Sequence, residues 1–237
     1  MANQQLRLNV RPLLAGLGSW VLVALVAGCQ RADRLPERAE QRSQEVIRQQ
    51  AEQGDAKAQY ELGTVLVRGE SGKPNYAEAA AWYRRAADQG HAPAQLALAE
   101  LYEAGQGVPF DPAEAARWFR RAAEQGHPVA QYCLATLYVA GKGVPRDIDE
   151  AIRWYRRAAE QGDAQAQYIL GARYRDGDGL APDPVEAWKW LSLAAAQDAP
   201  EAARARDELK RRLSREQLDE AQRRVKAFVP TKAWTAN

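Results

Sequence analysis

The sequence repeats every 36 residues over most of its length, and this period constrains the fold more than any other feature. Four blocks follow one another without gaps, at residues 51–86, 87–122, 123–158 and 159–194. Their glycines and tryptophans fall in register, at Gly54, Gly90, Gly126 and Gly162 and at Trp82, Trp118, Trp154 and Trp190. A period near 35 residues indicates an all-α solenoid, in which each unit buries its apolar face against its neighbours.

Each block is predicted to hold two antiparallel helices. In the first block, the first helix starts near Asp55 and carries apolar residues at helical spacing. Gly69 follows it, where a left-handed residue commonly ends a helix. The second helix opens in every block with Asn or Asp, followed three residues later by Glu, which predicts a capping box. These pairs are Asn75–Glu78, Asp111–Glu114, Asp147–Glu150 and Asp183–Glu186.

The segments that flank the blocks are predicted to be a tether and a cap. Residues 29–50 are polar and are interpreted as a tether followed by a first helix. Residues 195–229 predict two helices split at Ser214, which forms a capping box with Gln217, and residues 230–237 are a tail. The cap is expected to seal the open end of the array.

The cap and the blocks differ in charge. Residues 204–232 have a net charge of +5, whereas residues 51–194 have a net charge of −4. Two interpretations of the basic cap stay open: a solvated helix face, or a patch that faces lipopolysaccharide, anionic lipid or an acidic partner. The whole chain has a net charge of only +2, which gives no electrostatic case for nucleic acid as a partner.

The blocks resemble Sel-1-like repeats, which are related to the tetratricopeptide class. The resemblance rests on the A-x-Q-x-x-L-[GA] of the first helix, the G-x-G-V-P loop, the E-A-x-x-W-[YF]-R-R-A-A of the second helix and the closing E-Q-G. It covers residues 51–194, although the loop of the first block lacks the G-x-G spacing. The resemblance implies a right-handed α-solenoid of four helix–turn–helix repeats, followed by C-terminal capping helices.

The N-terminus has the pattern of a secretory signal peptide. Residues 1–12 carry two arginines and no acid, and residues 13–27 are almost entirely apolar, too short for a comfortable membrane span. The run ends in V-A-G-C, which resembles the lipobox of bacterial lipoproteins. That resemblance implies removal of residues 1–28, acylation of Cys29 (palmitate is one such group) and, with Gln30 next, an outer-membrane location facing the periplasm. The alternative is an uncleaved anchor with an incidental cysteine.

No constellation of catalytic, cofactor-binding or metal-binding residues is predicted. His91 and His127 occupy the same repeat position, at the start of a first helix, where they are expected to act as N-caps. Cys133 lies about 240° round the helix from His127, so the two do not form a nucleophile–base pair. The Asp176–Asp178 turn is only a fragment of a calcium loop, and a polar turn is favoured.

A candidate partner groove follows from the positions that vary between blocks. These residues share one face of each first helix, which by resemblance to tetratricopeptide-like solenoids lines the concave surface. The candidates are Glu61, Ala97, Glu100, Val129, Cys133, Thr136 and Ile169. The centre of this set is small and apolar, which suits a peptide or amphipathic helix. The alternative is that these positions vary because nothing constrains them.

The sequence leaves three function classes open. The first is a non-catalytic envelope lipoprotein that acts as a scaffold or adaptor, holding another envelope protein or peptide in its groove. The second is a cell-wall factor that binds peptidoglycan or another glycan and assists an envelope enzyme. The third, an enzyme in its own right, is disfavoured because no residues supply a reaction. Partner capture from the groove distinguishes the first class from the second.

Overall fold

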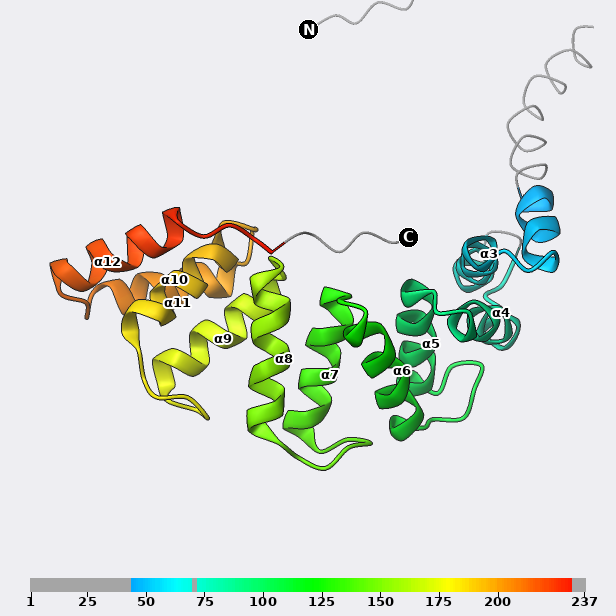
Figure 1. Ribbon diagram of the computed structural model, residues 1–237, viewed down its shortest axis with the longest axis horizontal. Coiled ribbons are helices and arrows are strands. Elements are labelled where there is room, and N and C mark those ends of the chain that lie inside the picture. Colours follow the sequence, from blue (N-terminus) through cyan, green and yellow to red (C-terminus); the bar gives the residue numbers. More distant parts are fainter. Residues whose placement is uncertain (1–43, 70–71, 232–237) are drawn as a thin grey trace, which may run out of the picture. The chain divides into compact units, whose positions relative to one another are not determined.

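The computed structural model describes residues 44–69 and 72–231, and within them every regular element is a helix. A helix over residues 44–52 precedes ten labelled helices. These are α3 (Ala56–Arg68), α4 (Tyr76–Asp88), α5 (Ala92–Ala104), α6 (Pro112–Glu124), α7 (Pro128–Ala140), α8 (Ile148–Glu160), α9 (Ala164–Asp176), α10 (Pro184–Ala195), α11 (Pro200–Lys210) and α12 (Arg215–Lys226). The predicted all-α repeat fold is therefore confirmed (Figure 1).

The chain divides into two units, Met1–Val46 and Ile47–Asn237. In the second unit each helix packs on the next along the chain from α3 to α11, and α12 returns onto α10. All residues of the described hydrophobic core lie in this unit, between Ile47 and Phe228. A chain that starts at Gln30 therefore keeps the whole described core. None of the described helices is long and apolar enough to span a membrane.

The helix boundaries follow the predicted caps. At the start of α3, Asp55 accepts a hydrogen bond from the Ala58 backbone N–H at 2.7 Å. The first helix of each repeat ends on a left-handed glycine, with φ of 67° at Gly69, 65° at Gly105, 66° at Gly141 and 75° at Gly177. Glycine adopts this conformation without the steric penalty of a Cβ, which explains its return every 36 residues.

The predicted capping boxes of the second helices form only by half. The Asp147 side chain accepts from the Glu150 N–H at 2.9 Å, as expected. The backbone N–H of Asp147, however, donates to the Tyr138 carbonyl at the end of the preceding helix. Because that donor is taken, the Glu150 carboxylate pairs instead with Arg153, one turn along α8. A complete box occurs at Ser214 and Gln217 on α12, as predicted.

A ladder of glutamine side chains joins each repeat to the preceding turn. Gln131 on α7 is buried, and its amide donates to the Ala123 carbonyl at 3.1 Å. Its side-chain oxygen accepts from the Gln161 amide at 2.8 Å. The same arrangement recurs at Gln59 with Gln89, Gln95 with Gln125, and Gln167 with Gln197. The ladder satisfies polar groups inside the array and explains why glutamine recurs in both motifs.

Arginines of the second helices cover the buried aromatic residues. On α6, Arg121 lies over the Trp118 ring, 4.4 Å from its centre. Its neighbour Arg120 donates to the Tyr138 hydroxyl of α7 and lies over that ring. Arg85 and Arg157 repeat the first contact, and Arg84 and Arg156 repeat the hydrogen bond of the second, to Tyr102 and Tyr174. The R-R pair of the motif thus stabilises the packing within and between repeats through cation–π contacts and hydrogen bonds.

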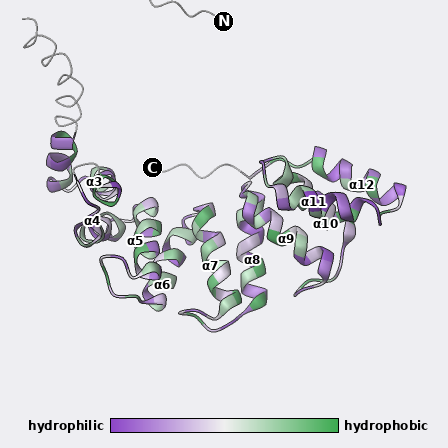
Figure 2. Ribbon diagram, turned by 180° about the vertical axis from the view of Figure 1, so that it is seen from behind, coloured by the Kyte–Doolittle hydropathy of each residue, from purple (hydrophilic) through white to green (hydrophobic). Residues whose placement is uncertain are grey.

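The C-terminal cap is held by contacts that do not repeat. Arg224 of α12 pairs with Glu186 of α10 at 2.7 Å. Phe228 then packs edge-on against Trp190, with ring centres 5.6 Å apart. Beyond it, the Thr231 backbone N–H donates to the Glu160 carbonyl at the end of α8. Most of α12 is hydrophilic (Figure 2), and Ala221 is its one buried residue.

Candidate functional site

The seven predicted groove residues lie on α3, α5, α7 and α9, the first helix (helix A) of each repeat. Together they form what we call the helix-A strip. Glu100 and Val129 are exposed, and Val129 keeps 39% of its surface accessible. The others, Glu61, Ala97, Cys133, Thr136 and Ile169, are half-buried. The residues that flank them on the inner side of each helix, such as Leu98 and Leu134, are fully buried. The strip is therefore the accessible edge of helices whose other face forms the core.

Cys133 lies at the middle of the strip, with acidic groups around it. Burial raises the pKa of its thiol to about 12, and the negative charges of Glu100, Glu103 and Asp163 contribute to that rise. Those acids come from α5 and from the N-cap of α9, so α7 lies between them. At neutral pH the thiol is protonated and a poor nucleophile. Cys133 is a free, half-buried cysteine.

The strip is acidic as well as apolar on its central helices. Although the surface of Glu100 is accessible, the surrounding helices partly desolvate its carboxyl, which raises its pKa, and the charge of Glu103 adds to the rise. The helix α7 has no charged residue, and α5 has no basic one. Along these two helices, Glu100 and Glu103 are thus the only formal charges.

Tyrosines border the strip, although variation between the repeats did not point to them. The rings of Tyr60 and Tyr83 are 5.7 Å apart, and those of Tyr132 and Tyr155 are 5.8 Å apart. Burial raises the pKa of Tyr155 to about 12, so its hydroxyl stays neutral. The signal was present in the sequence, because Tyr60 and Tyr132 occupy the same repeat position beside a strip residue.

Both histidines cap helices, as predicted. The Nδ1 atom of His91 accepts from the Ala94 N–H at 3.3 Å, and that of His127 accepts from the Ala130 N–H at 3.4 Å. Burial is the main cause that lowers the pKa of each imidazole. A neutral ring is what the cap requires, because only an unprotonated nitrogen accepts a hydrogen bond.

The Asp176–Asp178 turn is occupied by ion pairs. Asp176 pairs with Arg175, and Asp178 pairs with Arg173, at 2.7 and 2.8 Å. Each carboxylate therefore has its own guanidinium partner in the polar turn. Over residues 44–69 and 72–231, no cluster of three or more His, Cys, Asp or Glu side chains is arranged to hold a metal ion.

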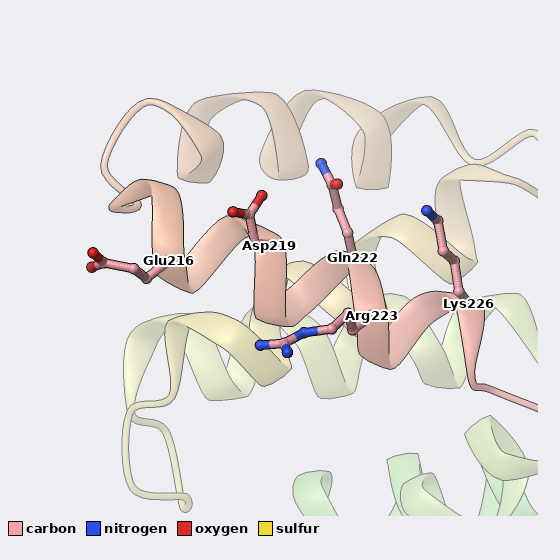
Figure 3. Close-up of a pocket in the computed structure, with 5 residues that line it drawn as sticks. All are labelled: Glu216, Asp219, Gln222, Arg223 and Lys226. Carbon is pink, nitrogen blue, oxygen red and sulfur yellow. The ribbon is translucent and has the colours of Figure 1, made fainter.

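The cap offers a second surface, along α12. A shallow pocket of about 430 Å³ is lined by Glu216, Asp219, Gln222, Arg223 and Lys226, and Figure 3 shows that all five project from this one helix. Its charges are mixed, and Arg223 is bound by Glu220 at 2.7 Å. Intramolecular pairs thus compensate part of the basic charge predicted for the cap, while Lys210, Arg211, Arg212 and Arg215 stay exposed.

The family follows from four consecutive matches to the Sel1 repeat, at residues 56–91, 92–127, 128–163 and 164–198. Together these matches cover more than half of the chain. The chain is a Sel1-repeat protein. Each repeat of the family starts at a first helix, five residues later than the blocks defined above, so the Sel1 boundaries coincide with α3, α5, α7 and α9. Proteins of this family generally mediate protein–protein interactions.

Two solved structures are similar to this Sel1-repeat protein. A protective antigen of uropathogenic Escherichia coli with an SLR fold is 31% identical with a TM-score of 0.53, covering 78% of this chain and 48% of that one. A Sel1 repeat protein from Oxalobacter formigenes is 38% identical with a TM-score of 0.60, covering 63% of this chain and 60% of that one. The matched region thus spans about half to three-fifths of those chains. A comparison with curated proteins gave no match.

The predicted lipidation site, Cys29, lies outside the described residues, as do the signal peptide predicted at residues 1–28 and most of the predicted tether. Acylation and the envelope location therefore stay predictions from the sequence. The seven strip residues are all described, and Glu100 and Cys133 are close enough for the carboxylate to shift the pKa of the thiol. The structure thus brings together residues that are 33 positions apart in the sequence.

Proposed function

We propose that this Sel1-repeat protein is a non-catalytic adaptor that binds another protein of the bacterial cell envelope across the helix-A strip. In this proposal, acyl groups on Cys29 hold the chain at the outer membrane, on its periplasmic side. Two or more acyl chains anchor a protein stably without a membrane-spanning helix.

The observation that carries the proposal is that, within each first helix, the recurring residues are buried and the varying residues are accessible. First-helix residues that recur in all four repeats are used for packing: the glutamines that the first helices contribute to the ladder are buried, and Leu62, Leu98, Leu134 and Leu170 are in the core. The residues that vary form an accessible edge instead. A solenoid presents such an edge over several repeats, which gives an extended surface for a partner.

Site-specific crosslinking in living cells tests the binding face. A photo-crosslinking residue at Ala97 or at Ile169 is expected to capture one and the same envelope protein. Arg117 on α6 is the matched control, because it is exposed and pairs only with Glu114. Arg120 is unsuitable, since it packs on Tyr138 of the next repeat. Equal capture from Arg117, or none from the strip, would contradict the adaptor function, and capture of glycan strands would favour the cell-wall role.

Fractionation tests the lipid anchor separately. The wild-type chain is expected in the membrane fraction after a high-salt wash, and the Cys29→Ala variant in the soluble fraction or still carrying its signal. High salt removes proteins held by surface charge alone but not those held by acyl chains. Equal retention of both chains, each with its N-terminus mapped by mass spectrometry, would show that the acyl anchor is not what holds the protein.

A further inference from the structure

We propose that the segment bound by the helix-A strip is a cationic amphipathic peptide, with a small apolar face and with lysine or arginine side chains that pair with Glu100 and Glu103. This inference rests on the proposed function, because it names the chemistry of the partner for the same face. Its basis is the combination of an apolar edge with two carboxylates that form no ion pair among the described residues.

The apolar part of the strip lies over neighbouring repeats. Ala97, Cys133 and Ile169 occupy the same repeat position on α5, α7 and α9, and each is half-buried. Val129 adds an exposed branched side chain at the start of α7. A ligand that crosses α5, α7 and α9 meets one apolar residue at this position on each helix, which matches the apolar face of an amphipathic segment.

Glu100 and Glu103 lack the cation partner that several other carboxylates of the array have. Among the described residues, Glu114, Glu150 and Glu186 on the second helices each pair with a Lys or Arg, and Glu61 pairs with Lys57 at 3.8 Å. Within the same residues, no Lys or Arg lies within 4.0 Å of Glu100 or Glu103. A basic side chain from a partner would supply the missing charge.

The repeat itself does not require these two acids. The residues equivalent to Glu100 are Thr64, Thr136 and Ala172, and those equivalent to Glu103 are Val67, Val139 and Arg175. Glu100 and Glu103 are one turn apart on α5, and the charge of Glu103 adds to the desolvation that raises the pKa of Glu100. Like charges one turn apart destabilise an isolated helix. The repulsion between the two acids therefore destabilises α5 locally, and a bound cation would reduce that repulsion.

The tyrosines beside the strip strengthen the preference for a cation. Tyr132 adjoins Cys133 and is half-buried, and its ring stacks at a tilt on Tyr155. The solenoid already uses tyrosine faces in this way, because Arg120 lies over Tyr138 and Arg173 lies over Tyr155. A lysine or arginine of the partner that reaches the strip thus meets carboxylates and aromatic rings together.

Two synthetic peptides test the inference directly. The first is an amphipathic 14-residue peptide of leucine and lysine, and the second has glutamate in place of every lysine. Both are titrated by calorimetry into the chain that starts at Gln30. The lysine peptide is expected to bind and the glutamate peptide to fail. The double variant Glu100→Lys/Glu103→Lys is expected to weaken binding of the lysine peptide at least tenfold.

A matched variant separates a specific site from general attraction. Asp88→Lys/Glu124→Lys changes the net charge by the same amount, at exposed positions on α4 and α6, and is expected to bind within twofold of the wild-type chain. Circular dichroism verifies that both variants are folded. An equal loss in the two variants, or equal binding of the two peptides, would overturn the inference.

The in-cell crosslink distinguishes failure of this inference from failure of the proposed function. With the photo-crosslinking residue at Ala97, the Glu100→Lys/Glu103→Lys chain is expected to lose the captured protein. If that chain still captures the same protein as the wild type, the face binds a partner but the cation is not what it recognises. If the wild type captures nothing from the strip, the proposed function itself is wrong.

Discussion

The inner repeats, α5 to α8, and the C-terminal end, α9 to α12, hold neighbouring helices together with different sets of contacts. The inner repeats use one set of contacts again and again: the glutamine ladder, the Arg–Tyr and Arg–Trp pairs, and loop glycines. At the C-terminal end, Ser192 and Leu193 replace the R-R pair, and α12 supplies Arg224 and Phe228 instead.

The two regions also differ in how far apart in the sequence their contacting residues lie. An inner junction joins residues 18 or 30 positions apart, as in Arg120–Tyr138 and Gln125–Gln95. The cap joins residues 38 and 71 positions apart, as in Arg224–Glu186 and Thr231–Glu160. Damage to an inner junction is expected to disrupt both neighbours, whereas damage to the cap is expected to fray one end.

The largest effect is expected from Gly143→Ala, in the loop between α7 and α8. Gly143 has φ of 68°, and a Cβ there would overlap the backbone carbonyl of Pro112 at the start of α6. Left-handed alanine costs about 1–2 kcal/mol, and the overlap adds about 1–3 kcal/mol. We expect a loss of about 2–5 kcal/mol in the free energy of unfolding, measured by urea denaturation.

Two other glycine-to-alanine variants serve as references for the stability loss at Gly143. At Gly162, with φ of 99°, a Cβ would meet nothing within 4 Å, so Gly162→Ala reports the backbone cost alone. At Gly179, in the last repeat, a Cβ would approach the Ile148 and Ile152 side chains at 2.6 and 2.8 Å, and side chains yield more easily than backbone. The expected order of loss is Gly143, then Gly179, then Gly162. A loss at Gly143 no larger than at Gly162 would contradict the overlap.

The next effect is expected from Phe228→Ala at the cap. Phe228 is half-buried and packs on Trp190, so its removal is expected to cost about 2 kcal/mol, below the roughly 3–5 kcal/mol typical of a fully buried phenylalanine. Hydrogen exchange is expected to accelerate in α12 and α10 while α5 to α7 keep their protection. Uniform acceleration over all repeats would contradict a locally fraying cap. The exposed neighbour Val229→Ala is the control.

The repeated part of the fold was predictable because its determinants recur in the sequence. The N-caps at Asp55 and Asp147 and the helix ends at Gly69 were predicted correctly from residue type and register. The fold of α12 back onto α10 was not predicted, because Glu186 and Arg224 are 38 positions apart and no pattern links them.

The capping boxes show a subtler limit. The spacing of Asp147 and Glu150 predicts a reciprocal pair, yet Tyr138 of the preceding helix accepts the hydrogen bond from the Asp147 N–H. Local sequence cannot report a donor that tertiary structure has already engaged. The candidate site behaves likewise: variation between repeats pointed to Glu100 and Cys133, but only their packing shows which charges surround the thiol.

A smaller loss is expected from Gln131→Met, which keeps the shape of the side chain and removes its polar atoms. The buried Ala123 carbonyl would lose its side-chain donor, and the Gln161 amide would lose its acceptor. We expect a cost of about 1–2 kcal/mol by urea denaturation. Gln167→Met is the comparison, because Gln197 also donates to the Gly162 carbonyl and keeps that bond. Equal costs for the two variants would show that the second bond adds nothing.

The smallest effect is expected from the histidine caps, and it depends on pH. Burial lowers the pKa of His91 and His127 below the ordinary value of 6.5. The unfolded chain therefore takes up protons first as the pH falls. The stabilisation is complete above the unfolded pKa and is lost as the pH drops through 6.5 towards the folded values.

The double variant His91→Asn/His127→Asn isolates this contribution, because asparagine caps a helix without titrating. Between about pH 7.5 and about pH 5.5 the wild-type chain is expected to lose about 1 kcal/mol more stability than the variant, measured by urea denaturation at each pH. Other groups, such as Asp163, are common to both chains and cancel in the comparison. A protonated ring nitrogen cannot accept a hydrogen bond, so parallel pH profiles of the two chains would contradict a stabilising role for the Nδ1 hydrogen bonds. The caps would then stabilise α5 and α7 by packing, with His91 against the Tyr60 ring, 5.1 Å away, as the first contact to test.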